Sequence, residues 1–276
     1  MRLSVSKIKS FKSCRRLYEL RYIERLRPVQ TAEALEIGKS YHKLLEALNN
    51  GTTFANNPEY ADDRSKEMAM ARAYERYIYP RFVVSEAEKW IEKDLGGGNI
   101  LVGQVDGIAG DGHIVEHKSY GGNDTMEQYE YNLLWDEQIL AYMFLTGKRK
   151  VWYTICRKPN IRLKKGETEE EFFYRMLDWY ETDTDEKIKL LEIERTDAEV
   201  EQFEEELMLM VNEMINTKYY YRNTCQCNMY GRRCEYSSVC LHYDPNQQYL
   251  EFVKEDEYEP EKNRNNESAV YSNVLL

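Results

Sequence analysis

Two glycine-rich turns, Gly96-Gly97-Gly98-Asn99 and Gly110-Asp111-Gly112, separate three strand-like segments at residues 82–94, 100–109 and 113–119. Short turns of this composition join neighbouring antiparallel strands, so these segments are predicted to form a meander. The second and third segments are largely apolar, as in sheets that are covered on both faces. The chain is therefore constrained to a sheet that other elements enclose.

Segments with helical periodicity lie on both sides of the meander. We expect a first helix after Ser4 or Ser6, further helices at residues 34–48, 61–79, 126–145, 168–180 and 198–214, and buried strands at 151–156 and 187–193. This order predicts an α/β or α+β fold, with a mixed central sheet flanked by helices. We predict a single domain over residues 1–253, followed by an acidic tail at 254–276 whose composition is that of a disordered segment.

The turn centred on Asp111 predicts which residues face each other across the second hairpin. Asp106 lies five residues before Asp111 and Glu116 five after it, so we expect the two carboxylates on opposed positions about 5 Å apart. Lys118 lies two residues beyond Glu116 and therefore on the same strand face. A buried carboxylate pair is costly unless a hard divalent cation neutralises it. The pattern thus predicts a metal site at Asp106 and Glu116, with Lys118 beside it.

The alternative is that Asp106 and Glu116 lie on a solvent-exposed face. The neighbouring residues argue against this, because they make both strands largely apolar: Val102, Val105, Ile108, Ile114 and Val115. Two acids and a lysine across a hairpin nevertheless do not by themselves identify a catalytic site. Further motifs in the chain are needed to decide.

Several short motifs occur in one order along the chain. They are Leu3-Ser4-Val5-Ser6-Lys7-Ile8 with Cys14 and Tyr18, Gly38 to His42, Gly103 to Asp106, Glu116-His117-Lys118, Gln138 to Tyr142, and the segment from Cys227 to Cys240. Together they resemble the RecB-like branch of the PD-(D/E)XK nucleases, with their restriction-endonuclease-like core. That branch includes AddB-type helicase–nucleases, CRISPR-associated exonucleases with an iron–sulfur cluster, and phage-encoded relatives. The resemblance covers about Leu3 to Cys240.

The resemblance implies a role for each matching residue. His42, Asp106, Glu116 and the backbone carbonyl of His117 would hold Mg²⁺ or Mn²⁺, and Lys118 would be the catalytic lysine. Gln138 and Tyr142 lie one helical turn apart and would orient the site and approach the DNA. Without the resemblance, His42 would be a hydrogen-bonded core histidine, Tyr142 a half-buried helix residue and Gln138 its surface neighbour.

The six cysteines do not suit a disulfide framework in a large cytoplasmic chain. Their wide spacing also differs from the close cysteine pairs of common zinc sites, although structural zinc remains an alternative. The resemblance implies a [4Fe–4S] cluster held by four of them, Cys14, Cys227, Cys234 and Cys240, which would join the N-terminal helix to the cysteine segment at 222–242. Cys225 is a second candidate for the position given to Cys227. Cys156 lies in an apolar strand and is expected to be a core residue.

Charge and hydropathy limit the classes of function. The net charge of −11 argues against a protein that coats DNA nonspecifically, but residues 1–27 carry nine Lys or Arg against two acids. The start of the chain lacks the apolar stretch of a signal peptide, and no apolar segment could span a bilayer, so we expect a cytoplasmic location without a membrane partner. The resemblance implies an exonuclease acting on single-stranded or duplex DNA ends, in recombination, repair or replication, as in phages. The alternatives are a non-catalytic DNA-binding or adaptor subunit and a structural zinc protein.

Overall fold

The computed structural model describes residues 1–29, 33–54, 57–122, 124–229, 232–242 and 252–254. The chain divides into two compact units. The first comprises Met1–Val5 and Ala32–Asn212, and the second comprises Ser6–Thr31 and Glu213–Leu276. Each unit thus combines segments from distant parts of the sequence. The predicted acidic tail lies outside the described residues, except for Lys254.

A mixed sheet forms the centre of the first unit. Its strands in the described chain are β1 (Arg2–Leu3), β3 (Val84–Gly96), β4 (Asn99–Ala109), β5 (Ile114–Tyr120), β6 (Lys150–Arg157) and β7 (Ile188–Glu194). They follow the order β1-β4-β5-β6-β7, and β3 also pairs with β4. The β3–β4, β4–β5 and β6–β7 pairs are antiparallel, whereas β1–β4 and β5–β6 are parallel. This arrangement confirms the predicted meander and mixed sheet.

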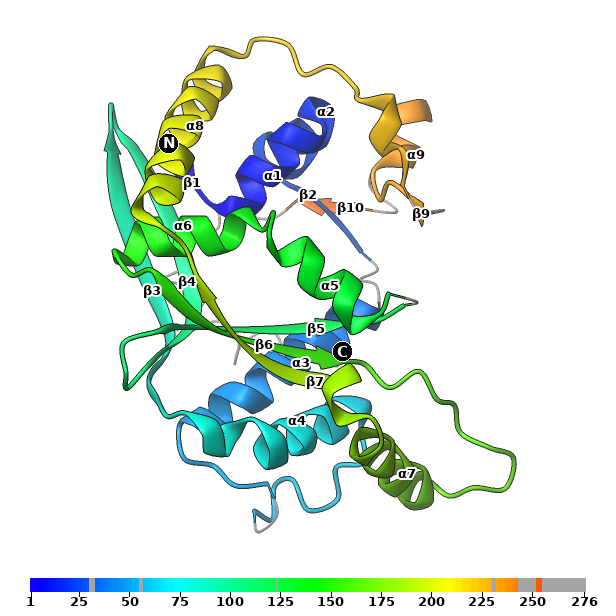
Figure 1. Cartoon of the computed structure of the whole chain (residues 1–276). Helices are drawn as coiled ribbons and strands as arrows, with labels where there is room; N and C mark the ends of the chain where they lie inside the picture. The colour runs from blue at the N-terminus through cyan, green and yellow to red at the C-terminus, as the bar shows by residue number, and fades with distance from the viewer. Residues whose placement is uncertain (30–32, 55–56, 123, 230–231, 243–251, 255–276) are drawn as a thin grey trace. The chain divides into compact units, whose positions relative to one another are not determined.

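Helices cover both faces of this sheet. Figure 1 shows α3 (Glu33–Asn49), α4 (Lys66–Tyr77) and α7 (Glu169–Glu181) on one face, and α5 (Met126–Leu133) and α6 (Glu137–Thr146) on the other. The first face holds a large apolar core in which Tyr41, Tyr74 and Phe173 pack near Cys156. On the second face, α6 packs directly on β4, because Gly103 has no side chain. A Cβ there would lie 2.7 Å from a Leu145 methyl group and 3.1 Å from the Tyr142 ring.

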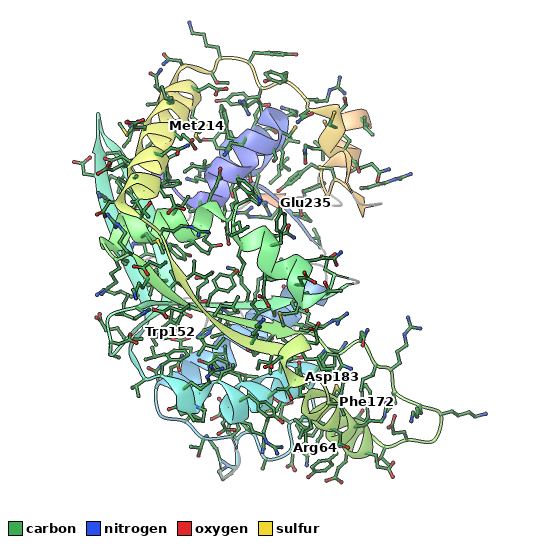
Figure 2. The ribbon with its side chains drawn as sticks, viewed as in Figure 1. Arg64, Trp152, Phe172, Asp183, Met214 and Glu235 are labelled. Carbon is green, nitrogen blue, oxygen red and sulfur yellow. The ribbon has the colours of Figure 1, made fainter. Side chains whose placement is uncertain are left out.

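The link between α4 and α7 is partly electrostatic. Arg64, just before α4, forms an ion pair with Glu170 at 3.6 Å. Its guanidinium group also lies 5.4 Å from the centre of the Phe173 ring (Figure 2). The helix itself begins at Lys66 and not at residue 61 as predicted, because the Ser65 side chain accepts a hydrogen bond from the Met68 N–H and caps it.

The predicted helix over residues 126–145 is two helices. The first, α5, starts at a capping box in which Thr125 and Gln128 bond reciprocally, and it ends at Leu133. The Asp136 side chain then accepts from the Gln138 N–H and starts α6 as a new helix. Apolar periodicity is almost continuous through this break, so it did not reveal it. Because Asp136 caps α6, it fixes where Gln138 and Tyr142 lie.

The second unit brings the N-terminal helices together with the cysteine segment. Its elements include α1 (Val5–Ser13), α2 (Arg15–Tyr18), a π-helical turn at Glu19–Ile23, β2 (Leu26–Pro28), η4 (Thr224–Gln226), β8 (Asn228–Met229), β9 (Arg232–Arg233), α9 (Ser237–His242) and β10 (Phe252–Lys254). Strands β2 and β10 pair antiparallel. Leu20, Leu26, Tyr236 and Phe252 share a small apolar core, where the Tyr236 hydroxyl donates to the Leu26 carbonyl at 2.7 Å. The remaining described elements are α8 (Asp197–Asn216), which reaches from the first unit into the second, and the short helices η2 (Tyr79–Arg81) and η3 (Thr184–Glu186) of the first unit.

Candidate active site

The hairpin between β4 and β5 has the predicted register. Gly107 faces Val115 and Ile108 faces Ile114, and each of these pairs is symmetric about Asp111. The ladder ends there, and the next opposed pair is Asp106 and Glu116. The Asp106 carboxylate accepts the backbone N–H of His117 at 2.6 Å, which holds it against β5. The structure therefore brings together the two acids that the sequence pattern paired.

Glu116 is enclosed and not solvent-facing. Only 2% of its surface is exposed, which rules out the alternative of a solvated acid pair. Its Oε1 atom accepts hydrogen bonds from Lys118 and from Gln138, the latter at 3.1 Å. Its Oε2 atom is buried and has no hydrogen-bond partner among the described residues. A buried carboxylate oxygen without a partner is unusual and indicates a missing positive group.

Lys118, Gln138 and Tyr142 form one hydrogen-bonded network with Glu116. The Lys118 ammonium group donates to Glu116 and also to the Gln138 side-chain oxygen at 3.2 Å. The Gln138 amide then donates to the Tyr142 hydroxyl at 2.7 Å. The predicted common orientation of Gln138 and Tyr142 on one helix face is therefore present, and both belong to the network around Glu116.

The network sets opposite charge preferences on its members. Burial raises the pKa of Glu116 from 4.5 to about 7, and the Asp106 charge adds to this although Lys118 acts in the other direction. The pKa of Lys118 is raised, since attraction to Glu116 and Asp106 outweighs the effect of its burial. Lys118 therefore stays cationic at neutral pH, while Glu116 lies near its titration point until a cation joins it.

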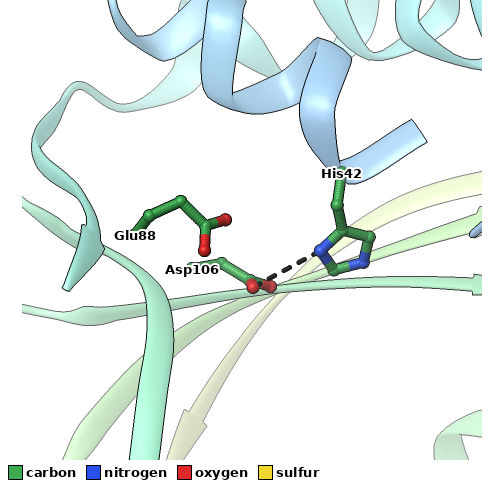
Figure 3. Close-up of side chains that lie close together, drawn as sticks. All are labelled: His42, Glu88 and Asp106. Carbon is green, nitrogen blue, oxygen red and sulfur yellow. Dashed lines mark ion pairs between the residues drawn. The ribbon is translucent and has the colours of Figure 1, made fainter. Parts of the chain in front are cut away.

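His42 approaches Asp106 from α3. Its Nδ1 atom lies 3.4 Å from Asp106 Oδ1 (Figure 3). Burial opposes charging of the imidazole, but the hydrogen bond and attraction to Asp106 outweigh it and raise the pKa of His42. Burial likewise raises the pKa of Asp106, yet His42, His117 and Lys118 outweigh that effect and lower it to about 2. Asp106 is thus a permanent carboxylate at the centre of the group.

His117 contributes its backbone to the centre, whereas its side chain lies in the core. The ring Nδ1 atom is 2.7 Å from the Thr154 hydroxyl, and the ring packs 5.2 Å from Tyr74. Burial lowers the pKa of this imidazole to about 4, so it is neutral at physiological pH. The resemblance assigned only the His117 carbonyl to the metal, and that role remains a prediction.

Glu88 is a member of the site that the sequence reasoning missed. Its carboxylate, the imidazole of His42 and the carboxylate of Asp106 each offer a ligand atom, and these atoms all lie within 4.8 Å of one another (Figure 3). Ala87 faces Gly107 and Lys89 faces Val105, so Glu88 is opposed to Asp106 across the first hairpin. Counting outward from Gly97, as was done from Asp111, would have found it.

The four cysteines assigned to a cluster all lie in the second unit. The Cys14 sulfur accepts the Asn223 backbone N–H at 3.3 Å, and the Cys234 N–H donates to the Cys227 carbonyl at 2.9 Å. Burial raises the pKa of both the Cys234 and the Cys240 thiols, and the charges of Cys14 and Cys227 add to the effect. The four thiols are thus electrostatic neighbours.

The other two cysteines differ from this set. Cys225 is exposed. Cys156 lies in the core of the first unit, as predicted, with its sulfur 3.4 Å from the Tyr180 hydroxyl. Burial raises the pKa of the Cys156 thiol to about 12, which keeps it protonated and inert.

The sequence profile of the PD-(D/E)XK nuclease superfamily matches residues 2–241. The chain belongs to this superfamily. Its mixed sheet with helices on both faces, and the acids and lysine on β4 and β5, agree with that membership. No curated protein matches the chain.

Solved structures support the fold. A protein of Eubacterium rectale, provisionally described as an exonuclease, is 14% identical, with a TM-score of 0.52 over 99% of this chain and 93% of its own. An alkaline exonuclease of Laribacter hongkongensis is 16% identical and has a TM-score of 0.37, covering 78% of this chain and 88% of its own. A phage-related exonuclease of Haemophilus somnus is 15% identical with a TM-score of 0.34, covering 64% and 83%. Among the described helices, none is both long and apolar enough to cross a membrane.

Proposed function

We propose that this protein is a metal-dependent DNA nuclease whose active centre is formed by Asp106, Glu116 and Lys118. The observation that carries the proposal is the state of Glu116, which is almost fully buried and keeps one carboxylate oxygen without a partner. A second carboxylate, Asp106, is held next to it by the His117 N–H. Purely structural acids would not be enclosed in this way, since burying unneutralised charge is costly.

The residues present fit a divalent cation. Asp106 and Glu116 supply the carboxylate oxygens that Mg²⁺ and Mn²⁺ prefer, and His42 supplies an imidazole that suits Mn²⁺ better. We assign His42, Asp106, Glu116 and the His117 carbonyl as the ligand set. A cation bound there would supply Lewis acidity that lowers the pKa of water and offsets charge on the scissile phosphate.

The remaining residues position the reacting groups. Lys118 carries a permanent positive charge beside Glu116 and can stabilise negative charge that develops on the phosphate or on an attacking water. Gln138 donates to Glu116 and Tyr142 while it accepts from Lys118, so it fixes all three side chains. Loss of Gln138 is therefore expected to misplace Lys118 without removing any charge.

We favour an exonuclease that acts on single-stranded or duplex DNA ends. The superfamily membership supports DNA as the substrate, and the Eubacterium rectale protein, matched over nearly its whole length, is described as an exonuclease. A role in recombination, repair or replication, as in phages, follows from the RecB-like resemblance of the motifs.

We further propose that Cys14, Cys227, Cys234 and Cys240 hold a [4Fe–4S] cluster in the second unit. Support comes from their gathering there across more than two hundred residues, while Cys225 is exposed. A cluster of this kind would cross-link the N-terminal helices to the cysteine segment. Anaerobically purified protein should then be brown with absorbance near ~400 nm, whereas structural zinc would leave it colourless.

End-labelled DNA tests the nuclease proposal. Wild-type protein is incubated with 5′- and 3′-labelled single and double strands, with Mn²⁺, with Mg²⁺ or with EDTA. We expect cation-dependent shortening from one end that Asp106→Asn protein does not perform. Tight DNA binding without any cleavage, in wild type and variant alike, would instead support the alternative of a non-catalytic adaptor.

A further inference from the structure

We propose that Glu88, together with His42 and Asp106, forms a second divalent-cation site that shares Asp106 with the site at Glu116. The inference rests on the proposed nuclease function and deepens it, since it gives the active centre two cations in place of one. It also reassigns His42 from the Glu116 site to the new one.

The geometry of the three side chains fits a single small cation. Donors on opposite sides of an ion with bonds of about 2.1 Å are about 4.2 Å apart. The ligand atoms of His42, Glu88 and Asp106 already lie within 4.8 Å of one another (Figure 3). Only small side-chain adjustments would therefore close the site around Mn²⁺ or Mg²⁺.

The backbone and a neighbouring amide direct Glu88 to this position. Glu88 has a φ of 49°, a left-handed conformation that residues other than glycine rarely adopt and that costs conformational energy. It faces Asp106 across the β3–β4 ladder. Gln104, two residues before Asp106 on β4, donates to Glu88 Oε2 at 2.6 Å and leaves Oε1 to accept a further partner.

Glu116 provides the independent observation that one cation at His42, Glu88 and Asp106 does not satisfy the whole centre. Its buried Oε2 atom has no hydrogen-bond partner among the described residues, and Glu116 does not belong to the group of three. Asp106 belongs to both sides, because Oδ1 is directed at His42 while Oδ2 lies at the β5 backbone beside Glu116. A bridging carboxylate between two cations is the arrangement that this geometry supports.

The charges in the centre agree with more than one cation. Asp106, Glu88 and Glu116 bring three carboxylates, and Lys118 is ion-paired with Glu116. One divalent cation would neutralise this set only before the substrate enters. Each phosphate of a bound DNA strand adds another negative charge.

Counting bound Mn²⁺ tests the proposal. Full-length protein is freed of metal with a chelator and titrated with Mn²⁺ at pH 8, while free Mn²⁺ is followed by electron paramagnetic resonance. We expect two ions in the wild-type active centre and one in Glu88→Gln protein. Glu116→Gln should also keep one ion, and Asp106→Asn should weaken both. In wild-type protein, two ions that share Asp106 should show magnetic coupling, which Glu88→Gln should abolish.

Two further variants control for folding and for charge. Glu88→Gly removes the carboxylate, while glycine adopts a positive φ without strain, so this variant should fold at least as well as wild type and still lose one ion. Glu86→Gln neutralises an exposed acid on the same strand, paired with Lys89 at 2.8 Å, and should keep both ions. The Mn²⁺ needed for half-maximal cleavage should rise more than about tenfold in both Glu88 variants, the lower bound for losing even an outer partner of a ligand.

The outcomes separate this inference from the nuclease proposal. Two ions with unchanged affinity in both Glu88 variants, or a single ion in wild type, would overturn the second site even if DNA is cleaved. Two ions in wild type and one in the Glu88 variants would support the second site even if no DNA is cleaved, and the nuclease proposal would then be the one that fails.

Discussion

Glu116→Gln should change how the stability of the metal-free protein depends on pH. Burial raises the pKa of Glu116 to about 7 from 4.5, so the folded protein favours the protonated acid. Below pH 4.5 this group is protonated in both states and does not oppose folding. As the pH rises towards 7, the unfolded chain gives up the proton first, and wild-type protein loses stability relative to the glutamine variant.

The size of the effect follows from the shift. The difference of 2.5 between 7 and 4.5 corresponds to about 3.4 kcal/mol at 1.36 kcal/mol per unit. About 2.5 kcal/mol of this falls between pH 5 and pH 8. Lys118 loses its ion-pair partner in the variant, but it stays cationic across this range and adds only a constant offset. The comparison also cancels the titration of His117, which both proteins share.

Urea unfolding in EDTA at pH 5 and pH 8 measures this difference. The free energy of unfolding of Glu116→Gln, relative to wild type, should increase by about 2.5 kcal/mol between the two pH values. Addition of Mn²⁺ at pH 8 should stabilise wild type by binding to the ionised carboxylates and should stabilise the variant much less. Parallel pH profiles for the two proteins would refute the assignment of Glu116 as a buried acid with a raised pKa.

Three further predictions follow from the site and the cysteines. His42→Ala should lower activity, and high Mn²⁺ should restore it better than high Mg²⁺ does; an unchanged metal dependence in cleavage assays would make His42 a core residue. Gln138→Ala should reduce the cleavage rate by about 10²-fold or more, because Lys118 loses its positioning, with little change in Mn²⁺ affinity; a loss of ion binding instead would make Gln138 part of the ligand scaffold. Cys227→Ser should bleach the protein and lower its solubility, whereas Cys225→Ser should keep the colour near ~400 nm; the reverse result would exchange their assignments.

The hairpin at Asp111 shows what the sequence could predict. A short glycine turn fixes register, and register alone places Asp106 opposite Glu116, so the core of the site followed from counting residues. The lysine followed from strand alternation. These rules are local, which is why they succeeded without knowledge of the tertiary structure.

Other features depend on contacts that local patterns do not encode. Apolar periodicity runs through residues 126–145, and only the capping by Asp136 reveals that α6 starts anew. Glu88 lies in a strand with many charged residues, and nothing in its neighbours signals a positive φ. The division into two units, each built from separate segments, depends on long-range packing such as that of Tyr236 against Leu26. Whether a metal cluster joins the predicted single domain remains a prediction.

The measurement that tests the central claim most directly compares wild-type and Lys118→Met protein on the same labelled DNA, after both have been shown to bind Mn²⁺. Lys118 is not a metal ligand in this account, so the variant should bind the cations and fold while it cleaves at least about 100-fold more slowly. Equal cleavage rates for the two proteins would contradict the claim that this centre hydrolyses DNA.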